Sequence, residues 1–180
     1  MLNLLIRMRP QDIDISLLKT GDVFLQHTEF SLRSPTTWFA YWIREVTKSK
    51  RNHTSECIII EWKPYMIESL VHWVSLRTRD DWLKVKVKRD FKRLRYSKKF
   101  YDNEKDYLIR WLQELDKTYD WHWILRMFIF QINGDWNTWG ITSESEWRCS
   151  EFTAYMKNLP WREHYSPKDF ENNKDFISLW

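Results

Sequence analysis

The sequence predicts a single domain of the α+β class. Apolar runs with strand preference concentrate between residues 23 and 88, whereas helical periodicity dominates from residue 107 onward. Strands and helices are thus segregated along the chain, which is typical of α+β folds rather than of alternating α/β folds. The 180 residues, 43% hydrophobic and 30% charged, suffice for one sizeable core, and 3 Gly and 5 Pro leave little material for a linker. We therefore expect residues 1–180 to form one domain.

The first elements are a turn, a strand and a helix. Gly21-Asp22 predicts a turn that leads into a short apolar strand, Val23-Phe24-Leu25. Ser34-Pro35-Thr36 then predicts a helix start. The apolar residues that follow recur on one helical face, namely Trp38, Phe39, Trp42, Ile43 and Val46.

Three strands are expected next. Cys57 to Ile60 is a short apolar run with strong strand preference, and Lys63-Pro64 predicts a break after it. Tyr65 to Leu70 resumes as a second strand, which Val71 to Leu76 would extend. Trp82 to Lys88 alternates apolar and polar residues with period two, as a half-exposed strand does.

The second half of the chain is predicted to be helical. One amphipathic stripe is formed by Tyr107, Leu108, Trp111, Leu112 and Leu115. Trp121 to Ile132 is apolar almost all round, which favours a buried helix that Asn133-Gly134-Asp135 ends. A final helix is expected around Glu146 to Leu159, with Pro160 just beyond its end.

The composition limits where in the cell the protein is expected and what it is expected to bind. No run approaches the roughly 20 apolar residues of a membrane span, and the N-terminus lacks a secretory signal, so we expect a cytoplasmic protein. A phage-encoded enzyme would also need no such signal. The net charge of +4 is uneven, because Lys84 to Lys99 holds nine Lys or Arg and one Asp, and the remainder is near −4. Clustered cations interleaved with apolar residues are consistent with nucleic-acid binding or, more simply, with a solvated strand face.

Cys149 is the first candidate for chemistry. Ser143 and Glu146 have the spacing of a capping box, which would place Cys149 within about the first helical turn. The start of a helix lowers the pKa of a thiol through backbone N–H groups and the positive end of the dipole, and Arg148 adds a nearby positive charge. The alternative is a small buried core residue.

A catalytic thiol also needs a base, and five histidines are available. His53 lies at the mouth of an apolar strand behind a polar loop, from which its ring could point into a cleft, although an exposed loop histidine is the simpler interpretation. His122 lies in the apolar stretch and suits a hydrogen-bonded core role. Cys57 lies inside a strand and is expected to be structural. The remaining histidines, His27, His72 and His164, show no second feature.

Five motifs in order resemble the permuted branch of the NlpC-type papain-like thiol amidases, which are distantly similar to lecithin:retinol acyltransferase-like proteins. The motifs are Gly21 to Leu25, Trp42 to Thr47 followed by His53, Tyr65 to Glu68, Lys117 to Trp121, and Cys149 to Tyr155. They span roughly residues 17–159, with residues 160–180 as a C-terminal extension. The resemblance implies a circularly permuted papain-like fold, in which a small antiparallel sheet or barrel packs against helices.

The resemblance also implies a catalytic set in the order His53, Glu68, Cys149. His53 would take the thiol proton and later protonate the leaving group, and Glu68 would orient the imidazole. Cys149 would attack the carbonyl carbon and form a thioester, with its own N–H as an oxyanion donor. Asp22 and Asp120, the other acidic residues of the motifs, are expected to shape turns and caps.

Glu56 departs from the family pattern, because the family follows its histidine with apolar and small residues where this chain has Thr54-Ser55-Glu56. A hairpin turn at Lys63-Pro64 would pair Glu68 with about Ile59, roughly 20 Å from His53. A bulge or an earlier turn would be needed to bring Glu68 under His53. Glu56 therefore stays open as a substitute orienting residue.

The expected function is a cysteine-dependent hydrolase that cleaves an amide bond, for example in a peptidoglycan stem peptide, through a thioester. Two alternatives remain open: an acyltransferase or lipid thioesterase of the same fold, and an inactive binding module that uses the basic segment Lys84–Lys99. A small amide, peptide or acyl substrate is the expected partner, and the oligomeric state is not predicted. We expect no metal and no cofactor, because the chain lacks CxxC and HxxxH pairs and a Gly-rich phosphate loop.

Overall fold

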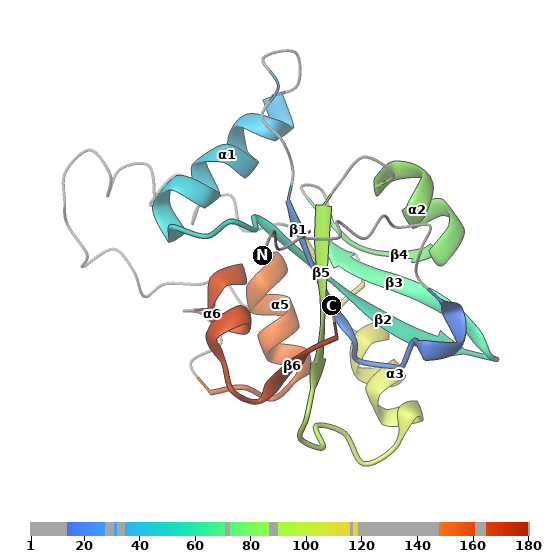
Figure 1. Ribbon diagram of the computed structural model, residues 1–180. Helices are drawn as coiled ribbons and strands as arrows, with labels where there is room; N and C mark the ends of the chain where they lie inside the picture. Colours follow the sequence, from blue (N-terminus) through green and yellow to red (C-terminus); the bar gives the residue numbers. More distant parts are fainter. Residues whose placement is uncertain are drawn as a thin grey trace, which may run out of the picture.

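The computed structural model describes residues 14–27, 31, 35–70, 73–86, 90–115, 117–118, 148–160 and 165–179. They form an α+β fold, as predicted from the sequence, with a six-stranded antiparallel sheet and helices packed against it (Figure 1). The strands are β1 (Val23–His27), β2 (His53–Ile60), β3 (Lys63–Ser69), β4 (Val74–Thr78), β5 (Asp90–Tyr96) and β6 (Phe176–Ser178). The helices are η2 (Ile15–Leu17, 3-10), α1 (Pro35–Thr47), α2 (Arg79–Lys86), α3 (Glu104–Leu112), α5 (Cys149–Met156) and α6 (Pro167–Asn172).

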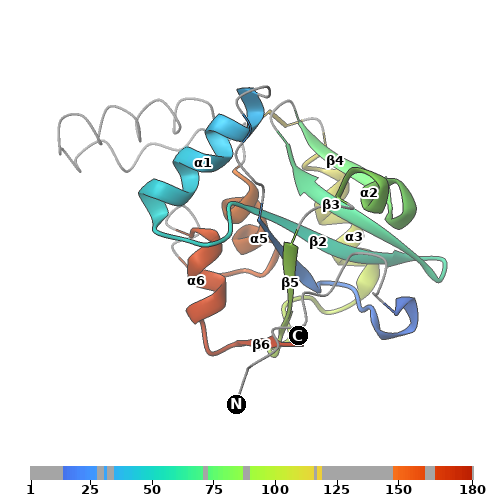
Figure 2. The same cartoon turned by 45° about the horizontal axis from the view of Figure 1, so that its top comes forward.

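The strand order in the sheet is β4-β3-β2-β1-β5-β6, with every neighbouring pair antiparallel. β6 comes from the C-terminal residues that the sequence left as an extension. It pairs with β5 at Tyr96↔Phe176, and Phe170 of α6 is fully buried. Both views show α6 beside α5 (Figures 1 and 2). The C-terminal residues therefore belong to the folded core.

The β2–β3 hairpin turns earlier than predicted. Its two central residues are Glu61 and Trp62, both at positive φ (49° and 66°), as in the type I′ turns that suit the twist of a two-residue hairpin. Lys63 and Pro64, predicted as a break, are instead the first residues of β3. Pro64 is tolerated there because β4 pairs with β3 only from Tyr65 onward.

Two further predictions in this region are wrong. The stretch predicted to extend β3 instead begins a separate strand, β4, at Val74. Residues 82–86, predicted as a strand, belong to helix α2. The Thr78 hydroxyl accepts a hydrogen bond from the N–H of Asp81 (3.2 Å) and donates one to its carboxylate (2.7 Å), which caps the helix. The cap and the burial of Trp82 against Phe24 (ring centroids 5.5 Å apart) outweigh the alternating pattern.

Helices cover both faces of the central strands. On one face, α3 and α5 pack on Ile58 and Ile67, with Tyr107, Trp111, Phe152 and Met156 buried between them. On the other face, Cys57 and Met66 pack with Phe24 and with Trp82 of α2. The predicted stripe is therefore confirmed for Tyr107 and Trp111, whereas Leu112 is half exposed. The predicted helix Trp121–Ile132 lies outside the described residues.

Helix α1 confirms the helix predicted from the Trp38-to-Val46 periodicity, but its apolar face is only partly covered. Ile43 is buried, whereas Trp38 and Trp42 are 46% and 40% exposed. Within the described ranges, no helix combines the length and the hydropathy of a membrane span.

Candidate active site

Helix α5 presents Cys149 as its first residue. Arg148 is the N-cap in an extended conformation, and its carbonyl accepts the N–H of Phe152 (2.8 Å). The predicted position of Cys149 in the first turn is thus correct, whereas the predicted Ser143–Glu146 capping box lies outside the described residues. Helix geometry leaves the N–H of Cys149 without an intrahelical acceptor. The charge of Arg148 is matched by Glu151, whose carboxylate lies 3.1 Å away in the same buried turn.

His53 is the first residue of β2, and its ring meets Glu68 of β3. Nε2 of His53 lies 2.8 Å from Oε2 of Glu68, and the Glu68 side chain is fully buried. The hairpin register explains the contact: Glu56 pairs with Ile67, so Glu68 comes opposite Ser55 and diagonal to His53. The sequence analysis required either a bulge or an earlier turn for this contact. The structure has the earlier turn, at Glu61 and Trp62.

Cys149 completes a line of three side chains with His53 and Glu68. Burial, the largest influence, raises the pKa of the Cys149 thiol. The opposing influences are the charge of His53, a hydrogen bond with its side chain, and hydrogen bonds from the N–H and the hydroxyl of Thr54. Together they outweigh burial and hold the pKa of Cys149 below its ordinary value. Because Nε2 of His53 faces Glu68, Nδ1 is the ring nitrogen left for the sulfur.

The other oxygen of Glu68 lies beside a cation. Nε of Arg77, on β4, lies 3.8 Å from Oε1 of Glu68. A buried carboxylate is stable as an anion only when cations or donors surround it. His53 and Arg77 supply this on the two oxygens of Glu68. Sequence reasoning missed Arg77, because only the β3–β4 register places it near Glu68.

Glu56 does not take the orienting role that the sequence left open for it. It is an odd number of residues from His53 along β2, so its side chain points to the opposite face. There its Oε2 accepts hydrogen bonds from the hydroxyl of Tyr107 and from Nζ of Lys157 (2.9 Å). Burial lowers the pKa of Lys157, although the neighbouring Glu56 carboxylate opposes this. Glu56 and Lys157 thus form a separate buried ion pair at the other end of α5.

The other candidates take structural positions or lie outside the described residues. Burial, followed by the nearby charge of Asp22, raises the pKa of Cys57 to about 12, as suits a structural thiol. Nδ1 of His27 bonds the carbonyl of Lys50 (2.9 Å) on the surface. The candidates that lie outside the described residues are His72, His122, His164 and Asp120.

Asp22 shapes the turn before β1, as predicted, and also binds β5. Its Oδ2 accepts the N–H of Lys19 (3.0 Å), and its Oδ1 lies 2.7 Å from Nε of Arg95. Arg93, buried beside it, donates to Oδ2 as well. One buried carboxylate therefore joins the first strand to two cations of the basic segment.

The cations of Lys84–Lys99 whose side chains the structure describes are engaged with carboxylates of the same chain. The pairs are Lys84–Asp81 (2.9 Å), Lys92–Glu171 (3.9 Å), Arg95–Asp22 (2.7 Å), Lys98–Asp175 (2.6 Å), Lys99–Asp102 (3.0 Å) and Arg93–Asp22. Much of the local charge of +8 is thereby neutralised, which weakens the argument for a phosphate-binding surface on this segment.

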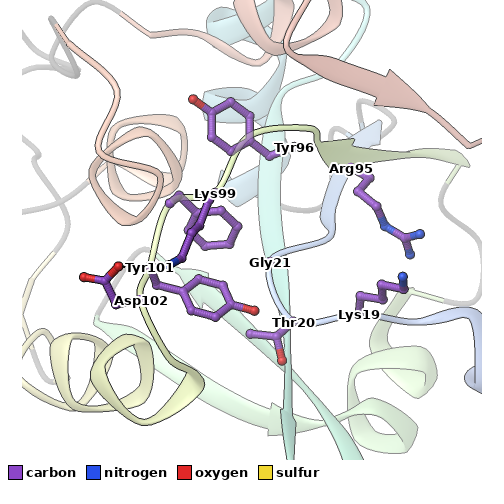
Figure 3. Close-up of a pocket in the computed structure, with 9 residues that line it drawn as sticks. Lys19, Thr20, Gly21, Arg95, Tyr96, Lys99, Tyr101 and Asp102 are labelled. Carbon is purple, nitrogen blue, oxygen red and sulfur yellow. Dashed lines mark hydrogen bonds and ion pairs between the residues drawn. The ribbon is translucent and has the colours of Figure 1, made fainter.

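A cavity of about 290 Å³ borders the end of this segment (Figure 3). Lys19 and Arg95 lie on one side of it and Asp102 on the other. An adjoining cavity of about 320 Å³ reaches Lys157 and Asn158 just after α5. These cavities thus lie at the end of α5 opposite to Cys149 and are separate from the Cys149–His53–Glu68 line.

Comparison with known proteins adds information on the fold. No family model and none of the curated proteins match this chain. Among solved structures, the chain is similar to the crystal structure of the metalloprotein yiiX from Escherichia coli O157:H7, DUF1105, with a TM-score of 0.50 and 21% identity. The match covers 77% of this chain and 63% of the other, so this chain spans less than two thirds of that protein. Within the described residues, no cluster of three or more His, Cys, Asp or Glu side chains is arranged to hold a metal ion.

Proposed function

We propose that this protein is a cysteine hydrolase of the permuted papain-like type that cleaves an amide bond through a thioester. The observation that supports the proposal most directly is the line formed by Cys149 at a helix start, His53 at a strand start and the buried carboxylate of Glu68. This arrangement combines a nucleophile, a base and a residue that orients the base. The chain order His53, Glu68, Cys149 is that of the permuted family described above.

The first half of the reaction forms the acyl-enzyme. His53 holds the thiol proton, and the sulfur of Cys149 attacks the carbonyl carbon of the amide. The oxygen becomes an anion, for which the N–H of Cys149 at the start of α5 is a suitable donor. The C–N bond then breaks as His53 gives its proton to the leaving amine. Glu68 stabilises the imidazolium and fixes the ring so that Nδ1 faces the sulfur.

The second half releases the acid and restores the enzyme. His53, now neutral, removes a proton from water, and the resulting hydroxide attacks the thioester carbonyl. The C–S bond breaks and the proton returns to the sulfur of Cys149. No step requires a metal, although the structural neighbour is titled a metalloprotein. Hydrolysis is therefore expected to continue in the presence of a chelator.

The decisive experiment is the pH dependence of iodoacetamide labelling of the native protein, mapped separately to Cys57 and Cys149. We expect rapid labelling of Cys149 at pH 6, because its thiolate is stabilised, while Cys57 stays unlabelled. His53→Ala should slow the labelling of Cys149, whereas the control His27→Ala should not. Slow labelling of both cysteines that rises only near pH 8.5, the ordinary thiol value, would refute an activated nucleophile.

Substrate class is tested next with matched amide and ester acyl donors, using Cys149→Ala as the inactive control. Amide hydrolysis that depends on Cys149 supports the proposal. Transfer of the acyl group to an added alcohol or amine in preference to water would favour the acyltransferase alternative. Turnover that persists in Cys149→Ala would contradict both.

A further inference from the structure

The cavity of about 290 Å³ is lined by two cations and by three aromatic rings (Figure 3). The cations, Lys19 before β1 and Arg95 on β5, form its basic edge, and in Figure 3 their charged ends point toward one another. Two cations that converge on one space repel each other unless an anion lies between them. The volume is near the lower end of the roughly 300–1,000 Å³ that is usual for ligand pockets. The cavity is therefore a candidate site for a small anion.

We propose that this cavity binds a small phosphate monoester that carries a planar apolar group. The phosphate would lie between Lys19 and Arg95, and the planar group against the aromatic rings. The site is at the end of α5 opposite to Cys149, so the inference does not rest on the function proposed above.

The basic edge carries more positive charge than the described carboxylates balance. Asp22 is the one described carboxylate within ion-pair distance of Arg95 (2.7 Å), and it also pairs with Arg93. Lys19 makes no ion pair within the described residues. Three cations thus have one carboxylate between them, which leaves an excess of two positive charges. A phosphate monoester carries about −1.5 to −2 at pH 7 and matches this excess, whereas a carboxylate supplies one negative charge.

Both cations of the basic edge have donors left for a ligand. Nε and Nη2 of Arg95 donate to Asp22, and Nη2 also donates to the carbonyl of Leu17 (2.9 Å). Nη1 of Arg95 makes no hydrogen bond with the described residues, and the other contacts hold the guanidinium in place for a ligand. The Lys19 ammonium likewise makes no hydrogen bond within the described residues, and its three donors can rotate onto an oxygen. A guanidinium and an ammonium are typical partners of phosphate oxygens.

The aromatic wall of the cavity consists of Tyr96, Phe100 and Tyr101. The rings of Phe100 and Tyr101 lie 4.6 Å apart, edge to face. Phe100 packs so closely on Gly21 that a Cβ at this position would collide with its ring. Gly21 also has a positive φ of 87°, which other residues rarely adopt. Three rings beside a phosphate site favour a ligand with a planar apolar group, because such a group buries its surface against them.

This site differs from the nucleic-acid surface for which the basic segment was considered. The cations of that segment that line the cavity are Arg95 and Lys99, and Lys99 is balanced by Asp102 (3.0 Å). Lys19, which has no ion pair within the described residues, lies outside the segment. The cavity therefore suits one small ligand rather than a run of phosphates.

The test is isothermal titration calorimetry of the full chain with phenyl phosphate, inorganic phosphate, benzoate and phenol. We expect phenyl phosphate to bind with the lowest Kd, and added salt to raise this Kd. Lys19→Gln should raise it about tenfold, because the variant removes a charged donor. Arg95→Lys, which keeps a cation for Asp22, should raise it as well. Lys168→Gln makes the same change of net charge on the exposed surface of α6 and should leave the Kd unchanged.

Four results would overturn the proposal. The first is no detectable binding of phenyl phosphate by the wild type. The second is an equal Kd in the wild type and in a folded Lys19→Gln protein, because the anion would then bind elsewhere. The third is benzoate or inorganic phosphate that binds as tightly as phenyl phosphate, which would contradict the match to a dianion or the role of the aromatic wall. The fourth is loss of binding in Cys149→Ala, which would place the ligand at the candidate active site.

Discussion

The buried pair of Glu56 and Lys157 gives a prediction that can be worked through from the structure. Both side chains are fully buried, and Nζ of Lys157 lies 2.9 Å from Oε2 of Glu56 and 4.2 Å from the ring centre of Phe100. Lys157→Met removes the cation but fills much the same volume. Of the two partners that the described residues give the buried Glu56 carboxylate, it leaves the hydroxyl of Tyr107 on α3.

The cost of this substitution follows from the orphaned charge. Removing one partner of a buried ion pair costs about 3–5 kcal/mol, because the remaining charge has lost its compensation. The lost cation–π contact with Phe100 adds to this, and a sulfur–aromatic contact of the new Met offsets part of it. We therefore expect Lys157→Met to lower the free energy of unfolding by roughly 3–5 kcal/mol.

The assay is urea unfolding of the wild type, both single variants and the double variant Glu56→Gln/Lys157→Met. The double variant removes both charges and keeps an acceptor for Tyr107, so it should regain part of the loss. The coupling between the two positions should be about 1–3 kcal/mol. A Lys157→Met protein whose free energy of unfolding lies within about 1 kcal/mol of the wild type would contradict the prediction. It would mean that the Glu56 carboxylate binds another partner or is protonated, and that the ion pair does not hold α5 on β2.

Three further predictions concern stability. Asp22→Asn leaves the buried Arg93 with a weaker partner and should cost about 3 kcal/mol in urea unfolding; a loss below 1 kcal/mol would contradict the role given to this carboxylate. Thr78→Ala removes the cap of α2 and should cost about 1 kcal/mol, whereas the exposed control Ser97→Ala should cost nothing measurable. Since the folded pKa of Cys57 is raised to about 12, the unfolded chain loses this proton first, and stability should fall by roughly 1.4 kcal/mol per pH unit from pH 9 toward pH 12. Cys57→Ala should flatten this decline in unfolding measured at pH 9, 10 and 11, and equal slopes in both proteins would refute it.

The elements that the sequence predicted well are those defined by local signals. The Gly21-Asp22 turn, the periodicity of α1 and α3, and Pro160 after α5 each act within a few residues, and the structure agrees with them. The predicted position of Cys149 in the first turn of α5 also agrees with the structure, although the capping box used to predict it lies outside the described residues. The contact between His53 and Glu68 was anticipated from motif order rather than from physical reasoning, because it joins two strands.

The errors arose where a short pattern competed with a non-local contact. Val85 and Val87 alternate with lysines, which favours a strand over that window, but the Thr78 cap and the burial of Trp82 produce helix α2. The basic segment shows the same dependence on distant residues, because Arg93 and Arg95 bind Asp22, about 70 residues away in the sequence. No local pattern could have indicated such a partner.

The register of the β2–β3 hairpin connects these points to the proposed chemistry. Glu61 and Trp62 adopt left-handed conformations that cost non-glycine residues roughly 1–2 kcal/mol each, so the pairing of the strands must offset this strain. A slip of one residue would turn Glu68 to the face of Glu56 and remove it from His53. The turn lies at the opposite end of β2 from His53, roughly 23 Å away at strand rise. The contact of Glu68 with the proposed base is thus fixed by two turn residues far from the nucleophile.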